Sequence, residues 1–112
     1  MIYLISAQSQ LYSSKLFENV SISEGIHQLK DMEEIGIDSE TTGLCCYKDK
    51  ILLLQLGNEE TQVLFDIASY DGLLPKELKE FLINFKGLYI LQNAKFDIKF
   101  LFRQDVILKK VY

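Results

Sequence analysis

A nearly continuous apolar run from Ile51 to Leu56, interrupted only by Gln55, constrains the fold of this chain more than any other segment. Such a run is typical of a strand that is buried on both faces. The next residues, Gly57-Asn58-Glu59-Glu60, have the composition of a hairpin turn, so Thr61 to Phe65 can return antiparallel to the run. With a preceding strand over Glu34 to Glu40, the sequence predicts a three-stranded antiparallel meander.

A helix, a strand and a second helix are predicted after the meander. Pro75 suits the first position of a helix, and apolar residues continue at helical spacing as far as Phe85. Leu88 to Gln92 is expected to form a fourth strand, which should join the sheet in parallel because a helix precedes it. Ala94 to Gln104 then predicts the final helix.

Shorter elements are expected at the two ends of the chain. Met1 to Ile5 has the character of a short strand, and a capped helix is predicted from Ser23 to near Asp31. Asp105 to Tyr112 is expected to begin another extended segment. The predicted fold class is therefore α/β, a mixed sheet flanked by helices.

Length and composition bound the classes of function. The 112 residues suffice for one domain, and 48% hydrophobic with 25% charged residues is typical of a globular protein. The net charge of −4 argues against an electrostatic clamp for duplex nucleic acid, which usually carries a basic face. No apolar run approaches the length that crosses a bilayer, so we expect a soluble, cytoplasmic protein with no membrane partner.

The cysteines and the histidine predict no site. Cys45 and Cys46 are adjacent, which strains a mutual disulfide, and no second pair completes a zinc site. Both are expected to be reduced thiols in a loop. His27 is expected on a helix surface without a role.

The segment Asp38-Ser39-Glu40-Thr41-Thr42-Gly43-Leu44 carries the first candidate site. Residues i and i+2 of a strand share a face, so Asp38 and Glu40 should converge, and two carboxylates at one point suit a hard divalent cation such as Mg²⁺. Thr41-Thr42-Gly43 should turn the chain and leave the pair at the open end of the strand. A bare pair of acids at this spacing is also compatible with a solvated strand end.

A second candidate site begins where the fourth strand ends. Asn93-Ala94-Lys95-Phe96-Asp97 enters the final helix, and open α/β sheets bind ligands beyond the carboxyl ends of their parallel strands. If the strand of Asp38 neighbours the fourth strand, Asp97 can face Asp38 and Glu40, and three carboxylates would repel one another without cations between them. The alternative is that Asp97 is a first-turn acid stabilised by the helix dipole.

Two further charged features remain open. Lys95, Lys99 and Arg103 form a basic stripe on the final helix, which is either a solvated face or a contact for a phosphate backbone. Asp66, after the third strand of the meander, is interpreted as a strand-end or turn residue.

The two acidic segments resemble the motifs of a known family. Asp38 to Leu44 matches the first motif of the DEDD 3′→5′ exonucleases, D-x-E-T-T-G-L, and Asn93 to Leu101 is similar to the second, N-x-K-[FY]-D-x-x-[FIL]-L. The similarity is greatest to the proofreading domain of family A, polymerase I type, DNA polymerases. It covers residues 34–112, and residues 1–33 resemble the lead-in strand and helix, so that 1–112 is expected to be a single, partial exonuclease domain.

The resemblance implies a ribonuclease H-like fold and hydrolysis of the terminal phosphodiester at a single-stranded DNA 3′ end. It implies that Asp38, Glu40 and Asp97 are catalytic residues and ligands of two Mg²⁺ or Mn²⁺ ions. Thr42, Leu44 and Asn93 are then expected to bind the substrate, with Leu44 as an apolar wedge against the terminal base. A polymerase domain, in cis or in trans, is the implied partner.

The family's third motif, a Tyr or His followed four residues later by Asp, is not found after the second motif in this sequence. It would be expected some tens of residues beyond Tyr112, and the chain resembles the first part of such a domain. Because a shared metal ligand is then missing, we expect weak or no activity from this segment by itself. The alternatives are a non-catalytic nucleic-acid-binding or interaction module derived from an exonuclease, and a mixed α/β domain whose acids are only surface charge.

Overall fold

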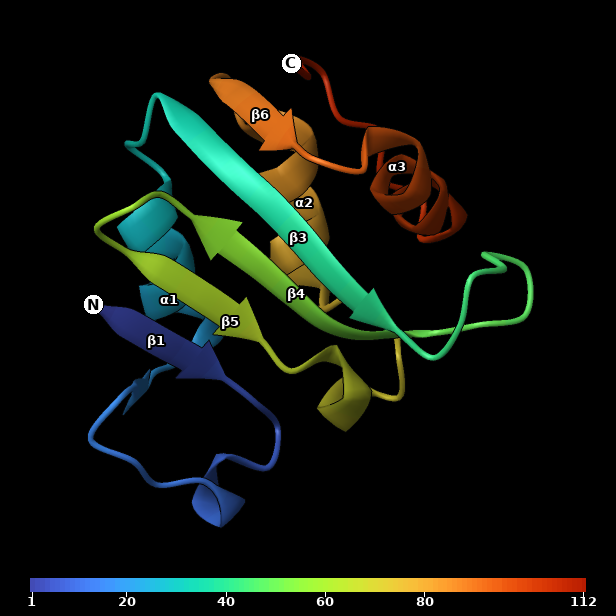
Figure 1. Cartoon of the computed structure of the whole chain (residues 1–112). Coiled ribbons are helices and arrows are strands. Elements are labelled where there is room, and N and C mark those ends of the chain that lie inside the picture. Colours follow the sequence, from blue (N-terminus) through green and yellow to red (C-terminus); the bar gives the residue numbers. More distant parts are fainter.

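The protein is described by a computed structural model that covers residues 1–112. Its centre is a six-stranded mixed sheet with the strand order β2-β1-β5-β4-β3-β6 (Figure 1). The strands are β1 Ile2–Ile5, β2 Glu18–Asn19, β3 Glu34–Thr41, β4 Ile51–Gly57, β5 Gln62–Phe65 and β6 Leu88–Leu91. The helices are α1 Ile22–Leu29, α2 Lys76–Asn84 and α3 Ala94–Arg103, with two short 3-10 helices at Ser9–Leu11 and Ile67–Tyr70.

The predicted meander and crossover are both present. β3 pairs antiparallel with β4, and β4 pairs antiparallel with β5. β6 returns after α2 and pairs in parallel with β3, with Gly36 opposite Ile90. The α/β fold class predicted from the sequence is therefore confirmed, including the parallel fourth strand of the motif region.

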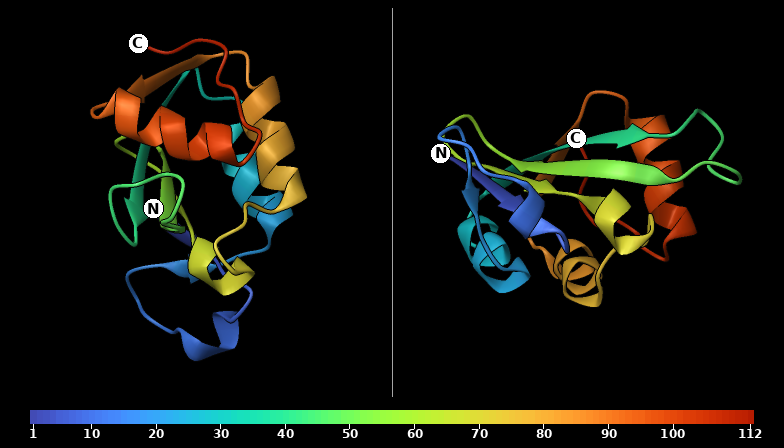
Figure 2. Two further views of the ribbon diagram at one scale, coloured as in Figure 1. Left: turned by 90° about the vertical axis from the view of Figure 1, so that its right-hand side faces the viewer. Right: turned by 90° about the horizontal axis from the view of Figure 1, so that it is seen from below.

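The helices form an asymmetric arrangement around the sheet. α1 and α2 cover one face, α3 lies at the β6 edge, and no helix covers the opposite face (Figure 2). The close packing of α1 requires Gly25, because a Cβ there would lie 2.2 Å from Cδ1 of Ile5. Only one face of the sheet is therefore part of the main core.

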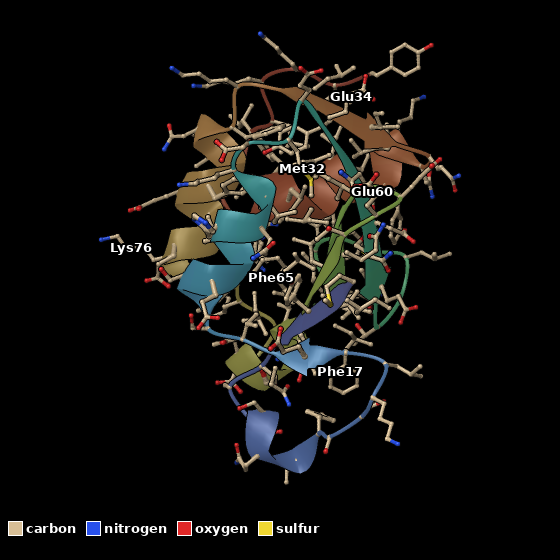
Figure 3. The ribbon with its side chains drawn as sticks, turned by 90° about the vertical axis from the view of Figure 1, so that its left-hand side faces the viewer. Phe17, Met32, Glu34, Glu60, Phe65 and Lys76 are labelled. Carbon is tan, nitrogen blue, oxygen red and sulfur yellow. The ribbon has the colours of Figure 1, made fainter.

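The core lies between the sheet and the helices. Phe65 is fully buried, and Met32 packs against the same cluster, whereas Lys76 and Glu60 lie at the outside (Figure 3). Tyr89 of β6 is also fully buried, and its hydroxyl donates a hydrogen bond of 2.7 Å to the carbonyl oxygen of Leu82. Burial raises the pKa of Tyr89, so this side chain stays a neutral donor.

Two expectations about these elements are wrong in detail. The first helix is capped by Ser21 rather than Ser23, since the Ser21 hydroxyl accepts a 3.1 Å hydrogen bond from the amide of Glu24, and it ends at Leu29. The apolar run of β4 is not buried on both faces. Leu52 is 38% exposed because its face of the sheet has no helix over it.

The final segment extends the sheet only locally. Val111 forms a parallel bridge with Tyr89. The bridge consists of two hydrogen bonds of 2.8 Å: the Tyr89 amide donates to the Lys110 carbonyl, and the Tyr112 amide donates to the Tyr89 carbonyl. The expected extended segment is thus confirmed near Val111, beside the β6 edge. None of the helices is long and apolar enough to cross a membrane.

Candidate active site

The two faces of β3 place its polar residues in different surroundings. Ile35 and Ile37 are buried, and Ser39 follows them on the same face by strand alternation. Asp38 and Glu40 alternate onto the other face and are exposed. The sequence-based expectation that these two acids share one face near the end of the strand agrees with this pattern.

α3 brings Asp97 to β3. The residue is only 3% exposed, and the Ser39 hydroxyl donates a hydrogen bond to its Oδ1. The amide of Asp97 donates to the carbonyl oxygen of Asn93 at 3.1 Å, as is usual in a first helical turn. Asp97 is therefore a buried group that joins the second motif to the first across 58 residues of sequence.

The electrostatics of Asp97 differ from those of an ordinary surface acid. Burial raises the pKa of Asp97, the negative charge of nearby Asp38 raises it further, and the hydrogen bond from Ser39 opposes both effects. No Lys or Arg compensates this carboxyl, because the one ion pair of the chain joins Lys76 and Glu80 at 3.9 Å on α2. No basic side chain forms an ion pair with the carboxyls of the site.

The structure brings Asp97 to Ser39 and Asp38, but it does not collect three ligating side chains at one point. No group of three or more His, Cys, Asp or Glu side chains lies close enough to hold a metal ion. Asp97 is turned toward the Ser39 hydroxyl, and mutual repulsion favours separation of the carboxylates. The assignment of Asp38, Glu40 and Asp97 as metal ligands remains a prediction.

The donor set nevertheless fits a hard divalent cation. Asp38, Glu40 and Asp97 offer carboxylate oxygens, the ligands preferred by Mg²⁺, and none of them is neutralised by a basic side chain. A cation would supply the charge that the neighbouring pair Asp38 and Asp97 lacks.

The turn after β3 is held by a residue that the sequence reasoning missed. Asp49 accepts a hydrogen bond of 3.1 Å from the Thr42 hydroxyl through Oδ1 and one of 2.9 Å from the Cys45 amide through Oδ2. A Cβ on Gly43 would lie 2.5 Å from the same Oδ2, so the close approach requires glycine. Asp49 thus holds together, by these two hydrogen bonds, the turn that carries Leu44.

The predicted substrate-binding residues lie around this turn and at the start of α3. Leu44 is 88% exposed at the tip of the turn. Both the amide and the hydroxyl of Thr42 are used inside the turn, by the Lys50 carbonyl, the Lys50 amide and Asp49. Asn93 is exposed at the α3 N-cap, and its side chain makes no capping hydrogen bond.

The other candidate residues have ordinary places. Asp66 follows β5 and accepts a hydrogen bond of 2.7 Å from the Ser6 hydroxyl, in agreement with its interpretation as a strand-end residue. His27 is exposed on α1, and Cys45 and Cys46 are free thiols, as expected. Lys95, Lys99 and Arg103 are exposed along α3.

Ser39 is the functional residue that sequence reasoning overlooked most clearly. A signal was present, because a polar residue continues the otherwise apolar face of Ile35 and Ile37 and so needs a polar partner in the helical layer. For Asp49, the signal was an acid at the end of a tight turn, two residues before the apolar strand that begins at Ile51.

Comparisons with known proteins agree with this arrangement. Residues 15–112 match the 3′-5′ exonuclease family of DNA polymerase A type. DNA polymerase I of Aquifex aeolicus is 35% identical over 94 residues, which is 80% of this chain but only 15% of that protein.

Solved structures share the fold at low sequence identity. Brucella melitensis NrnC superposes with a TM-score of 0.68 at 15% identity, covering 99% of this chain and 47% of that one. RNase D of Trypanosoma brucei in complex with RNA gives a TM-score of 0.69 at 16% identity, covering 98% and 36%. The chain thus spans about half or less of the length of these relatives. From the extent of the family match, the chain belongs to the 3′-5′ exonuclease family of the DNA polymerase I type.

Proposed function

We propose that this chain is part of a metal-dependent exonuclease that hydrolyses the terminal phosphodiester bond at single-stranded DNA 3′ ends, in the service of a DNA polymerase. The single observation that carries the proposal is the Ser39–Asp97 hydrogen bond. It holds a buried carboxyl of α3 beside Asp38 of β3, with no protein cation in reach.

Each carboxylate has a distinct part in the proposed site. Asp38 and Glu40 are exposed and alternate onto the face of β3 opposite to that of buried Ile35 and Ile37. No helix covers that face of the sheet (Figure 2), so a polynucleotide end has access to it. Asp97 is fixed from behind by Ser39 and cannot rotate freely away from Asp38. Exposed acids next to a fixed, buried one give a site with one rigid and two adjustable ligands.

Divalent ions held by Asp38, Glu40 and Asp97 would lower the pKa of an attacking water and offset the charge on the phosphate and the leaving oxygen. The protein's own contribution is to place Leu44 for contact with the terminal base and to fix its turn through Asp49. Such contact with a base face is tolerant of sequence, as a proofreading site requires.

Calorimetric titration with Mn²⁺ tests the metal site directly. We expect divalent binding by the unaltered chain and binding that is about 10–100-fold weaker after Asp38→Ala. Glu59→Ala, an exposed acid in the turn between β4 and β5, is the matched control and should bind as the unaltered chain does. If millimolar Mn²⁺ does not bind at all, the non-catalytic module is the better account.

A 3′-labelled single-stranded DNA oligonucleotide with Mg²⁺ or Mn²⁺ tests the reaction. We expect little or no mononucleotide release by these 112 residues alone, because they supply three of the four carboxylates that the family uses. Any release should require the metal and Asp38. Robust release that Asp38→Ala abolishes would support the reaction while contradicting the expected weakness of the segment alone.

A further inference from the structure

A groove of about 570 Å³ lies between the turn after β3 and the outward side of α3. It adjoins the candidate active site, since Ile98 directly follows Asp97 in the helix. Its lining includes Leu44, Tyr47, Ile98, Lys99, Phe102 and Arg103. The groove has the size of a binding site for a small ligand or a single nucleotide.

The apolar lining of the groove is unusually open to solvent. Tyr47, in the turn after β3, is 76% exposed, and Phe102, in α3, is 61% exposed. The Arg103 guanidinium lies 5.0 Å from the centre of the Tyr47 ring, within range of a cation–π contact. A gathering of exposed rings and aliphatic side chains on a small protein indicates a surface that binds something.

The charge beside the groove selects the kind of partner. The charged side chains of α3 are Lys95, Lys99, Arg103 and Asp97, and Asp97 is buried. The exposed charges of this helix are therefore all basic, although the chain as a whole carries −4. None of the three bases forms an ion pair within the protein.

The spacing of these bases suits a polyanion. Residues four apart on a helix are separated by about 6 Å along its axis, a step close to that between successive phosphates of an extended strand. Aromatic faces next to a basic track are the combination by which proteins hold unpaired nucleic acid.

We propose that this groove binds one unpaired base of single-stranded DNA, stacked on the Tyr47 and Phe102 side, with its flanking phosphates on Lys99 and Arg103. The proposal rests on the proposed function for the identity of the substrate, and it adds a second contact point beyond the terminal nucleotide. The strand would then lie along α3 as its 3′ end reaches Asp38.

Fluorescence anisotropy in EDTA tests the groove without hydrolysis. The probe is a 5′-fluorescein-labelled oligothymidylate of about eight nucleotides. We expect measurable binding by the unaltered chain and about tenfold weaker binding after Phe102→Ala or Tyr47→Ala. The double substitution Lys99→Gln with Arg103→Gln should lower the slope of log affinity against log salt by about 1.4, from about 0.7 per lost phosphate contact.

Two controls match these variants on surfaces away from the groove. Leu73→Ala removes an exposed apolar side chain, and Lys86→Gln removes an exposed base. Both should bind the probe as the unaltered chain does. All the substituted side chains are exposed, so circular dichroism should show the folded state in every variant.

The proposal is overturned if the unaltered chain does not bind the probe, if the groove variants bind equally well, or if the controls weaken binding as much. Failure of the proposed function looks different. In that case Mn²⁺ does not bind the unaltered chain, while the anisotropy measurements in EDTA still separate the groove variants from their controls.

Discussion

Asp97 is the residue at which folding and function make opposite demands. Its carboxyl is buried, lies near Asp38 and has a single side-chain donor, Ser39. A buried carboxylate without a compensating cation costs stability, so burial shifts the pKa of Asp97 upward, toward the protonated form. A metal site needs the ionised form.

Replacement of Asp97 by Asn should therefore stabilise the metal-free protein at neutral pH. The pKa of Asp97 is raised in the folded state, so the unfolded chain loses its proton first as pH rises. The free energy of unfolding is therefore highest below the unfolded-state pKa and falls as pH rises through the folded-state pKa. The Asn variant keeps an oxygen for the Ser39 hydroxyl and escapes this loss.

Urea unfolding in EDTA across a pH series measures the effect. The free energy of unfolding of Asp97→Asn should exceed that of the unaltered protein near pH 7 and converge with it in acid, where Asp97 is protonated. Asp31→Asn, on an exposed acid after α1, should show no such difference. A variant less stable than the unaltered protein at pH 7 would contradict this account of Asp97.

At the scale of elements, the turn between β3 and β4 is organised by one side chain. Asp49 bonds the Thr42 hydroxyl and the Cys45 amide, and its own amide donates to the Cys45 carbonyl at 2.8 Å. Leu44, at the tip, makes little contact of its own. The position of Leu44 is therefore set by Asp49, near the other end of the turn.

Asp49→Ala should loosen the turn without unfolding the sheet. We expect the Cys45 amide to exchange with solvent about fivefold faster, since one net hydrogen bond contributes about 1 kcal/mol. Hydrogen exchange followed by NMR measures this, and Glu60→Ala in the other turn of the meander serves as the control. Unchanged exchange of the Cys45 amide would contradict the proposed role of Asp49 in the turn.

The contact between α2 and β6 depends on the buried Tyr89 hydroxyl. Tyr89→Phe leaves the Leu82 carbonyl without this donor in a closed core, so we expect a loss of about 1–2 kcal/mol in unfolding free energy. Urea titration measures it. Tyr12→Phe, at a partly exposed ring outside the core, should change stability by less than about 0.5 kcal/mol.

The sequence predicts well those strand pairings that join segments close together in the chain. The pairing of β3, β4 and β5 follows from one apolar run and short turns, and the crossover to β6 follows from the helix before it. The place of β1 beside β5 has no such local signal, because the paired residues, such as Ile2 and Gln62, are far apart in the chain.

The candidate site divides in the same way. The two acids of β3 could be placed on one face because strand alternation is local. The partnership of Ser39 with Asp97 spans 58 residues and exists only once α3 has packed at the sheet edge. Ser21 rather than Ser23 is the helix cap because Glu24 then occupies the third helical position. Ser21 and Glu24 together form a capping box.

For the whole molecule, the relevant property is the uneven distribution of charge. The chain is acidic overall, yet its candidate site combines uncompensated carboxyls with a helix whose exposed charges are basic. Divalent cations should consequently act on the stability of the entire fold. A ligand that binds only the native state raises the free energy of unfolding. Once the ligand concentration exceeds its dissociation constant, this gain grows with the logarithm of the concentration.

Added Mg²⁺ or Mn²⁺ should raise the midpoint of thermal unfolding, and EDTA should reverse the shift. At ten times the dissociation constant the gain is about 1.4 kcal/mol, a few degrees for a domain of this size. Differential scanning fluorimetry measures it. Asp38→Ala should remove most of the shift, whereas Glu59→Ala should retain it; equal shifts in both variants would point to nonspecific ion effects.

The hydrogen bond between Ser39 and Asp97 also bears on when, during folding, the candidate site is assembled. Hairpins between neighbouring strands close early because little chain entropy is lost, while contacts across 58 residues close later. An intermediate with the meander formed and α3 undocked would have the acids of β3 but no assembled site. In such a partly folded chain Asp97 would lie away from Asp38, so tight binding of a divalent cation would report that α3 has docked.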